Sequence, residues 1–456
     1  MTIKETQEGL LKKDFSAVEL VDAYLQKINK YNKDLNVFLT VTEEEAYSKA
    51  KEVEKVLDSK VTKPLLGVTV AYKDLYLTKG VRTTAGSKVL ESYIPAYSAT
   101  VVKKLEEAGA IKLGKVNCDA WAHGASGENS DFGSTQNPWN KNYVSGGSSS
   151  GSAASVASGM SLVAMGTDTG GSVRQPANFC GIVGLKPTYG AISRFGVVSM
   201  ASSLDTIGSF GHTIDDVETV FDVVRGEDGF DSTVKNFTPK KRTKLRLGIA
   251  KEYFMQGLDK EVEDSIEEVI KVYKSLGIEI TSLSLPHTKY AVPVYYIIQP
   301  AEVSSNLGRY DGIRYGKDRN TFGDEAKRRI MLGTYVLSAG YYDAYYLQAQ
   351  KVRSKLIEDF DRAFEQVDAL ISPVSPTPAF KIGEKSSDPL KMYLADIYTA
   401  GANLAGIPGL AVPSSFSKRG LPLGFQLLGP RFSEYDLFEL GKKYHKAVDY
   451  KPKVAL

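Results

Sequence analysis

The sequence predicts an α/β fold in which a mixed central β-sheet is flanked by helices on both faces. Short apolar segments typical of buried strands alternate with segments of helical periodicity over most of the 456 residues. Hydrophobic residues make up 42% of the chain and charged residues 24%, a balance that allows the large core such a fold requires. We find no internal repeat, and no run approaches the roughly 18 apolar residues of a membrane span.

The N-terminal segment, residues 1–62, is predicted to be helical. Ser16 and Glu19 have the spacing of a capping box, and apolar residues follow them at helical intervals. A second helix, rich in Glu and Lys, is predicted at about residues 43–58. We expect this segment to be part of a single domain that spans residues 1–456.

Strands and helices then alternate along the chain. A helix capped by Ser98 is predicted to end before Gly109, and a later helix, which contains Val262 and Tyr273, before Gly277. Residues 226–244 are polar, and we interpret them as a surface loop because the alternation continues on both sides. Strands are predicted at residues 65–72, 110–113, 160–166, 181–185, 245–250 and 278–283.

Charge and composition exclude several classes of function. Lys and Arg outnumber Asp and Glu by only 57 to 54, which indicates neither a nucleic-acid groove nor a polybasic membrane patch. The two cysteines, Cys118 and Cys180, suit a cytoplasmic protein, and the N-terminus lacks the apolar core of a secretory signal. The four histidines form no metal-binding motif, so we expect no metal site.

Two familiar motifs are matched only superficially. Residues 109–115 resemble a phosphate-binding loop, but the next residue is Val116, which has no hydroxyl for Mg²⁺, and the order of elements is wrong. Residues 147–151 match the G-x-S-x-G pattern around Ser149, but a polar loop precedes them where that pattern requires a hydrophobic strand. We reject both.

Two segments rich in glycine and serine carry the strongest chemical signal. The first, residues 144–154, would alone suggest a flexible linker, yet it leads into small residues and a buried strand. The second, residues 166–181, begins where a strand ends and starts a predicted helix, with Pro176 in an early turn. Ser172 could simply cap that helix. Alternatively, backbone N–H groups converge on it as an oxyanion hole requires.

Taken together, four motifs in order resemble the amidase signature family. The resemblance implies the fold of that family and a Ser-Ser-Lys triad, with Ser172 as the nucleophile that forms an acyl ester, Ser148 as the bridge and Lys73 as the base. The motifs are Lys73-Asp74, Gly146-Gly147-Ser148-Ser149, residues 166–174 and residues 181–188.

The same resemblance implies two backbone features. The N–H groups of Thr169, Gly170, Gly171 and Ser172 are expected to bind the oxyanion. The peptide bond between Gly147 and Ser148 is expected to be cis.

The chemistry of the triad also follows from the residues themselves. Serine is a weak nucleophile until a base removes its proton, and without a well-placed histidine that base must be lysine in its neutral form. Burial of Lys73 at the end of a strand would lower its pKa. Asp74 would oppose that shift, but neighbouring strand residues point to opposite faces, so we expect Asp74 to face away from the amine.

Further stretches in the C-terminal half resemble the glutamine-hydrolysing subunits of tRNA-dependent amidotransferases within this family. The stretches are residues 309–316, 323–335, 340–346 and 403–409. The resemblance implies that the chain supplies ammonia to a tRNA-binding, kinase-like partner, assisted by a small third subunit, to convert Glu-tRNA(Gln), Asp-tRNA(Asn) or both. ATP and Mg²⁺ would be used by the partner, with no cofactor on this chain.

A glutamine pocket needs a cation for the α-carboxylate and an anion for the α-ammonium group. The motif alignment places Arg329 and Asp396 in these roles and Tyr295 as a hydroxyl contact. Individually, the three could instead be a helix surface charge, an acid on a helix face and a packing residue.

Two other functions remain open. The chain could be a stand-alone amidase that acts on small carboxamides, or a non-enzymatic assembly protein, although the intact triad argues against the latter. The span from Tyr315 to Phe322 is shorter than the resemblance leads us to expect.

Overall fold

The computed structural model describes the chain except residues 59–62, 239–241, 243, 255–256, 315 and 386–391. Eleven strands form one sheet: β1 (Phe38–Val41), β2 (Thr69–Lys73), β3 (Ile111–Val116), β6 (Val163–Asp168), β7 (Val183–Lys186), β8 (Thr206–Gly211), β9 (Leu247–Ala250), β10 (Ile280–Leu283), β11 (Ala369–Pro373), β12 (Gly409–Phe416) and β13 (Pro422–Leu428). A separate two-stranded ribbon consists of β4 (Gln136–Asn137) and β5 (Asn140–Val144).

The α-helices are α1 (Ile3–Lys12), α2 (Ala17–Leu35), α3 (Glu43–Asp58), α4 (Thr100–Glu107), α5 (Ser150–Ala157), α6 (Arg174–Cys180), α7 (Ile214–Val224), α8 (Lys260–Ser275), α9 (Ala291–Asn306), α10 (Asp324–Val336), α11 (Gln348–Gln366), α13 (Ala400–Ala405) and α14 (Glu434–Ala447). A π-helical turn, η7 (Tyr342–Leu347), precedes α11, and the 3₁₀ turn η8 (Leu394–Asp396) precedes α13.

The sheet is mixed, as predicted. Its strand order is β1-β3-β2-β6-β8-β7-β12-β13-β11-β9-β10. A central antiparallel region from β6 to β11 has parallel pairs on either side, such as β2 with β6 and β9 with β10, and the edge strand β1 is antiparallel to β3. Six strands are buried along their whole length in the described structure, as expected for strands covered on both faces: β2, β6, β7, β8, β11 and β13.

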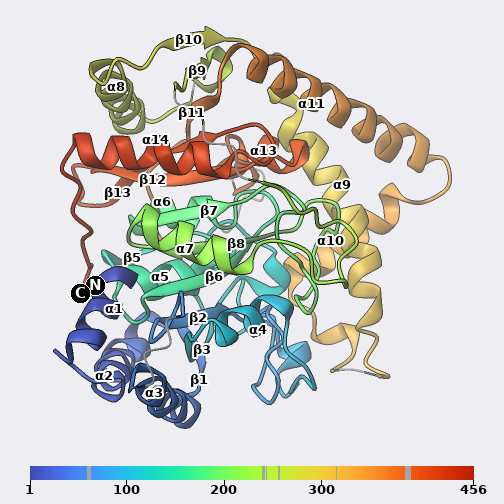
Figure 1. Ribbon diagram of the computed structural model, residues 1–456. Coiled ribbons are helices and arrows are strands. Elements are labelled where there is room, and N and C mark those ends of the chain that lie inside the picture. Colours follow the sequence, from blue (N-terminus) through green and yellow to red (C-terminus); the bar gives the residue numbers. More distant parts are fainter. Residues whose placement is uncertain (59–62, 239–241, 243, 255–256, 315, 386–391) are drawn as a thin grey trace.

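Helices cover both faces of the sheet. Helices α5 and α6 pack against each other and against strands near the middle of the sheet, while α7 packs with α4 and α14. Helices α9, α10, α11 and α13 contact one another and form a separate helical layer beside the sheet (Figure 1). No helix in the described ranges is long and apolar enough to cross a membrane.

Most predicted elements are present, but with shifted bounds. The strand expected at residues 65–72 begins only at Thr69. The capping prediction for Ser98 is wrong. Helix α4 begins at Thr100 after Ala99, without a side-chain cap, because the Ser98 hydroxyl accepts a hydrogen bond from the Lys79 N–H at 3.0 Å instead. The capping box of Ser16 and Glu19 is confirmed.

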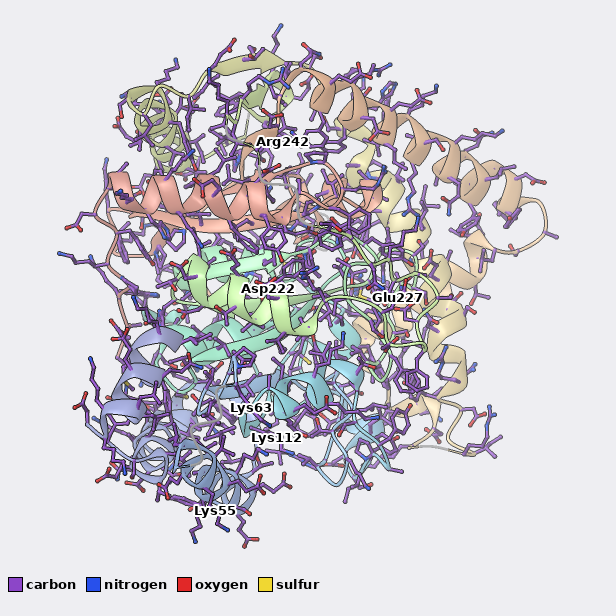
Figure 2. The ribbon with its side chains drawn as sticks, viewed as in Figure 1. Lys55, Lys63, Lys112, Asp222, Glu227 and Arg242 are labelled. Atoms are coloured by element: carbon purple, nitrogen blue, oxygen red, sulfur yellow. The ribbon has the colours of Figure 1, made fainter. Side chains whose placement is uncertain are left out.

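The N-terminal segment contains a strand that was not predicted. Between α2 and α3, β1 pairs antiparallel with β3 and extends the sheet by one edge strand. Within residues 226–244, the described part forms no helix or strand, and an ion pair between Arg194 and Asp231 anchors it to the body of the protein. Charged side chains of both signs, including Lys55 and Asp222, are distributed over the surface (Figure 2), in keeping with a net charge of +3.

The parallel pairing of β2 with β6 positions the candidate site. Tyr72 pairs with Met165, so Lys73 and Thr167 both emerge at the carboxyl ends of neighbouring strands. Side chains at such ends meet at one edge of a sheet, a common position for functional residues in α/β proteins.

Candidate active site

Lys73 is the last residue of β2, and its side chain is fully buried. Its Nζ lies 2.8 Å from Ser148 Oγ, 3.0 Å from Ser149 Oγ and 2.8 Å from Thr167 Oγ1. Three hydroxyl groups therefore surround the amine, and none of them forces it to remain charged.

Burial lowers the pKa of Lys73 to about 8, although Cys118, Asp119 and Asp168 act in the opposite direction. Asp74 faces away from the amine, as expected, and accepts hydrogen bonds from Lys115 Nζ at 3.1 Å and from the Thr84 N–H at 2.9 Å. The lowered pKa favours the neutral form of the amine, which is the form that a general base requires.

Ser148 lies in a tight loop between β5 and α5 and is fully buried. The peptide bond between Gly147 and Ser148 is cis, as predicted. Gly147 has no room for a side chain, because a Cβ atom there would collide with the Asp119 carboxylate. Asp119 also donates its own backbone N–H to the Ser148 carbonyl at 3.2 Å, so it supports the bridging serine through the backbone.

Ser172 lies between the end of β6 and the start of α6 and is 7% exposed. Its carbonyl accepts a hydrogen bond from the Ser149 N–H at 3.2 Å, which ties the two glycine-serine segments together. Among the described residues, no hydrogen bond joins the hydroxyl groups of Ser148 and Ser172. The structure therefore places Lys73 and Ser148 in direct contact and holds Ser172 beside them through the backbone of Ser149.

The four N–H groups predicted to bind an oxyanion differ in availability. The Gly171 N–H already donates to Asp168 Oδ1 at 2.9 Å. Within the described chain, those of Thr169, Gly170 and Ser172 donate to no protein acceptor. Asp168 competes for the Gly171 N–H because its carboxylate points back over the turn that follows β6.

A buried ion pair fixes this turn. Arg174 donates to Asp168 through Nε at 3.1 Å and Nη2 at 3.0 Å, and Asn403 donates to the same carboxylate at 2.9 Å. Burial alone would raise the pKa of the Asp168 carboxyl, but the charge of Arg174 holds this pKa far below its usual value. Arg174 also donates to Gln426 on β13 at 2.9 Å, so a distant strand supports the loop that carries Ser172.

The predicted glutamine-binding residues converge near this loop. Arg329 on α10 is buried, donates to Glu325 at 2.8 Å and to Gln299 at 2.9 Å, and lies over the Tyr296 ring. The Tyr296 hydroxyl donates to Asp396 at 2.9 Å, so one tyrosine ring links the cation to the anion.

Tyr295 approaches the nucleophile loop directly. A Cβ atom on Gly170 would lie only 2.7 Å from Tyr295 Cζ, so glycine is required where this ring packs. Burial raises the pKa of Asp396 to about 7, against the opposing effects of Tyr296 and Arg329.

No group of three or more His, Cys, Asp or Glu residues in the described ranges is arranged to hold a metal ion. The arrangement instead provides a buried amine, adjacent hydroxyl groups, free backbone donors and a pair of opposite charges. Such a set can cleave a carboxamide through an ester on serine.

Comparison with known proteins decides the family. The family model described as Amidase matches residues 19–438. The chain belongs to the amidase family. It is 52% identical to the glutamyl-tRNA(Gln) amidotransferase subunit of Carboxydothermus hydrogenoformans, over 98% of this chain and 98% of the relative.

Solved structures of the amidase family share the fold. The crystal structure of the glutamyl-tRNA(Gln) amidotransferase subunit from Thermotoga maritima is 39% identical and matches with a TM-score of 0.85 over 100% of this chain and 98% of the other. The peptide amidase from Stenotrophomonas maltophilia has the same TM-score, 0.85, at 26% identity, over 100% of this chain and 98% of the other. Similarity in sequence is thus greater toward the amidotransferase subunits.

Several contacts within the candidate site were not predicted from the sequence. Ser149 and Thr167 contact Lys73. The sequence placed Ser149 in the second family motif and Thr167 in the third, but indicated no role for either. Tyr296 contacts both Arg329 and Asp396, whereas the motif alignment predicted its neighbour Tyr295 as the tyrosine of the glutamine pocket. Arg174 lies within the third motif, but the sequence indicated no role for it. Its position two residues after Ser172 could have suggested that it supports this segment.

Proposed function

We propose that this amidase is the glutamine-hydrolysing subunit of a tRNA-dependent amidotransferase. The contact between the buried amine of Lys73 and Ser148, 2.8 Å apart, is the observation that carries the proposal, because it pairs a base of lowered pKa with a hydroxyl in the segment beside Ser172. The relatives named as amidotransferase subunits support the choice of substrate.

In the proposed mechanism, Ser172 Oγ attacks the carboxamide carbon. Its proton passes through Ser148 to Lys73, and the oxyanion accepts hydrogen bonds from the N–H groups of Thr169, Gly170 and Ser172. The C–N bond then breaks, Lys73 returns the proton through Ser148 to the leaving nitrogen, and ammonia departs. The Gly171 N–H can join the oxyanion site only if Asp168 releases it.

Deacylation repeats these steps with water as the nucleophile. Water attacks the carbonyl carbon of the ester and gives up a proton through Ser148 to Lys73. The bond to Ser172 Oγ breaks, Ser172 recovers a proton, and glutamate is released. Ser149 and Thr167 hold the Lys73 amine in place throughout.

Glutamine is recognised at its α-carbon by charge. Arg329 pairs with the α-carboxylate, Asp396 pairs with the α-ammonium group, and the Tyr295 hydroxyl contacts the substrate near Gly170. Glu325 and Gln299 fix the Arg329 guanidinium through two of its five N–H donors, which leaves others for a ligand.

The ammonia serves a partner. We infer a kinase-like, tRNA-binding partner that uses ATP and Mg²⁺, together with a small third subunit, in the cytoplasm. The acceptor is Glu-tRNA(Gln), and Asp-tRNA(Asn) is a second candidate. This chain, with a net charge of +3 and no nucleotide loop in its sequence, leaves tRNA and ATP to the partner.

The test is glutaminase turnover of the isolated chain, followed by addition of the co-expressed partners, ATP and mischarged tRNA. We expect a poor glutaminase alone and strong stimulation in the complex. Full activity of the isolated chain on simple carboxamides, with no stimulation, would instead establish a stand-alone amidase, a function compatible with the shared fold of the peptide amidase.

A further inference from the structure

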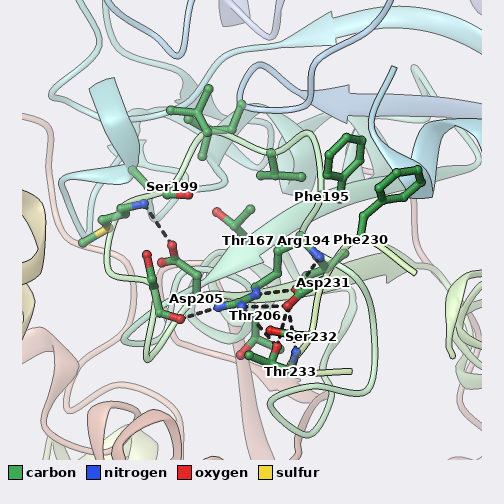
Figure 3. Close-up of a pocket in the computed structure, with 17 residues that line it drawn as sticks. Thr167, Arg194, Phe195, Ser199, Asp205, Thr206, Phe230, Asp231, Ser232 and Thr233 are labelled. Atoms are coloured by element: carbon green, nitrogen blue, oxygen red, sulfur yellow. Dashed lines mark hydrogen bonds and ion pairs between the residues drawn. The ribbon is translucent and has the colours of Figure 1, made fainter. Parts of the chain in front are cut away.

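A cavity of about 240 Å³ lies next to the ends of β6 and β8 (Figure 3). A single water needs only roughly 10–15 Å³ of such volume, so the cavity has room for several. It is lined by Leu75, Ala122, Thr167, Asp205, Thr206 and Ile207, by residues 194–195, 197–200 and 202, and by residues 230–233.

Thr167 connects the cavity to the chemistry. Its side chain lines the cavity, and its Oγ1 lies 2.8 Å from Lys73 Nζ. Thr169 is two residues further along, so its side chain points to the same face, and it donates to Asp205 at 2.8 Å. Lys73 and Thr169 do not line the cavity themselves, but each contacts a residue that does: Thr167 for the base and Asp205 for the oxyanion segment.

The cavity is separate from the proposed glutamine pocket. None of Ser172, Tyr295, Arg329 and Asp396 lines it. Tyr295 contacts the oxyanion segment at Gly170, whereas Asp205, in the cavity wall, contacts it at Thr169.

The outer end of the cavity reaches the surface and offers no free cation to an anion. Phe230, which contributes to its lining, is 65% exposed. Within the described chain, Arg194 is fully engaged: it donates to Asp231 at 2.8 and 3.0 Å, to Thr233, to the Tyr189 hydroxyl and to the Ser202 carbonyl. The lining is mixed, with apolar side chains beside hydroxyl groups at Thr167, Ser199 and Thr206. A cavity of this kind, which reaches from an exposed loop to Thr167, suits water better than a charged ligand.

We propose that this cavity is a second access route, through which the hydrolytic water reaches the acyl-enzyme. The inference rests on the proposed function, in which the acyl group on Ser172 occupies the pocket of Arg329 and Asp396 during deacylation. Water that enters from the cavity attacks the ester carbon, and its proton passes through Ser148 to Lys73. The bond to Ser172 Oγ then breaks, and that oxygen is reprotonated. No further reactant is required.

Ser199 allows a direct test, because it lines the cavity, is half-buried and makes no side-chain hydrogen bond in the described structure (Figure 3). Ser199→Leu narrows the cavity, and Ser199→Ala is the matched control. Acylation and deacylation rate constants are measured separately, in the complex, by rapid quench and mass spectrometry of the acyl-enzyme. We expect Ser199→Leu to slow deacylation severalfold with acylation unchanged, and Ser199→Ala to change neither.

Unchanged deacylation in Ser199→Leu would overturn the inference. An equal fall in the acylation rate would also overturn the inference. Such a fall would mean either that the substitution damages the whole site or that the cavity is the exit route of the leaving ammonia. If Ser199→Leu does not fold, Ser232→Phe at the exposed end of the cavity serves the same purpose. The measurement is repeated with a simple carboxamide, so that absence of glutamine turnover in the wild type counts against the proposed function and not against the cavity.

Discussion

The segments that carry the chemistry and the helices that carry recognition are built differently. Residues 144–182 are buried without exception, and their glycines and serines place backbone groups where longer side chains would collide. The residues proposed to recognise glutamine are charged and aromatic side chains on α9, α10 and η8. The outer face of α10 is exposed, with Met331 at 72% and Tyr335 at 47%.

The difference indicates that chemistry and substrate choice can be changed separately. In the catalytic segments, position is fixed by the backbone, so almost any enlargement disturbs the site. In the proposed recognition layer, charge resides in the side chains of Arg329 and Asp396, which contact Tyr296, whereas Tyr295 packs against Gly170 of the oxyanion segment. Proteins of one family can therefore keep the reaction and vary the amide.

The largest effects should come from the catalytic side. Ser172→Ala should reduce amide hydrolysis by at least roughly 10³-fold, as removal of a nucleophile does in other serine hydrolases. Lys73→Arg should be nearly as inactive as Lys73→Ala, because arginine cannot release its proton to become a base. Substantial turnover by the arginine variant would reduce Lys73 to an electrostatic role. Circular dichroism provides the check on folding.

Substitutions on the recognition side should discriminate between substrates. Arg329→Lys and Asp396→Asn should lower kcat/KM for glutamine by about 10- to 100-fold, the range expected for a hydrogen bond to a charged group. Hydrolysis of an amide without an α-amino acid group should change little. Equal losses on both substrates would show that the two residues are structural, and the comparison between the regions would fail.

The pH dependence of amide hydrolysis should distinguish the catalytic segments from the recognition helices. Lys73 acts as a base only when neutral, so kcat should rise through a pKa of about 8 and level off above it. Asp396 binds an ammonium group only when ionised, so kcat/KM for glutamine should also fall as the pH drops through about 7. The simple amide should show only the higher transition. An identical profile for both substrates would contradict the assignment of Asp396.

The smallest effect on activity should come from a substitution in the N-terminal helices, outside both the catalytic segments and the recognition helices. Ser16 caps α2, and its hydroxyl accepts the Glu19 N–H at 3.1 Å. Ser16→Ala should lower the free energy of unfolding by about 1 kcal/mol, as loss of an N-cap does, with kcat unchanged. Urea unfolding and steady-state kinetics measure the two quantities. A lower kcat would mean that the N-terminal helices are coupled to the site.

Sequence analysis predicted the parts of the structure that are encoded locally. The α/β class, the burial of Lys73 and the cis peptide before Ser148 agree with the structure, as does the orientation of Asp74. The fold class follows from the alternation of strands and helices along the chain, the burial of Lys73 and the orientation of Asp74 from the pattern of one strand, and the cis peptide from the family resemblance. The edge strand β1 was missed because its pairing with β3 is a long-range property that four residues do not encode.

Contacts between distant segments could not be predicted. Tyr295 and Tyr296 are adjacent on α9, and only the rotation of that helix decides which one reaches Asp396. The Gly171 N–H was expected to be free, but the turn that brings Asp168 over it is set by Arg174, Asn403 and strands far along the chain. Thr167 contacts Lys73 only because β2 and β6 are neighbours.

The most direct test of the account is to identify the residue that carries the acyl group. The protein is mixed with glutamine, quenched in acid within the first turnover, and digested for mass spectrometry. The account predicts a γ-glutamyl group on the peptide that contains Ser172, and none in the Ser172→Ala variant. An acyl group on Ser148 or Ser149, or turnover without any acyl-enzyme, would contradict the central claim.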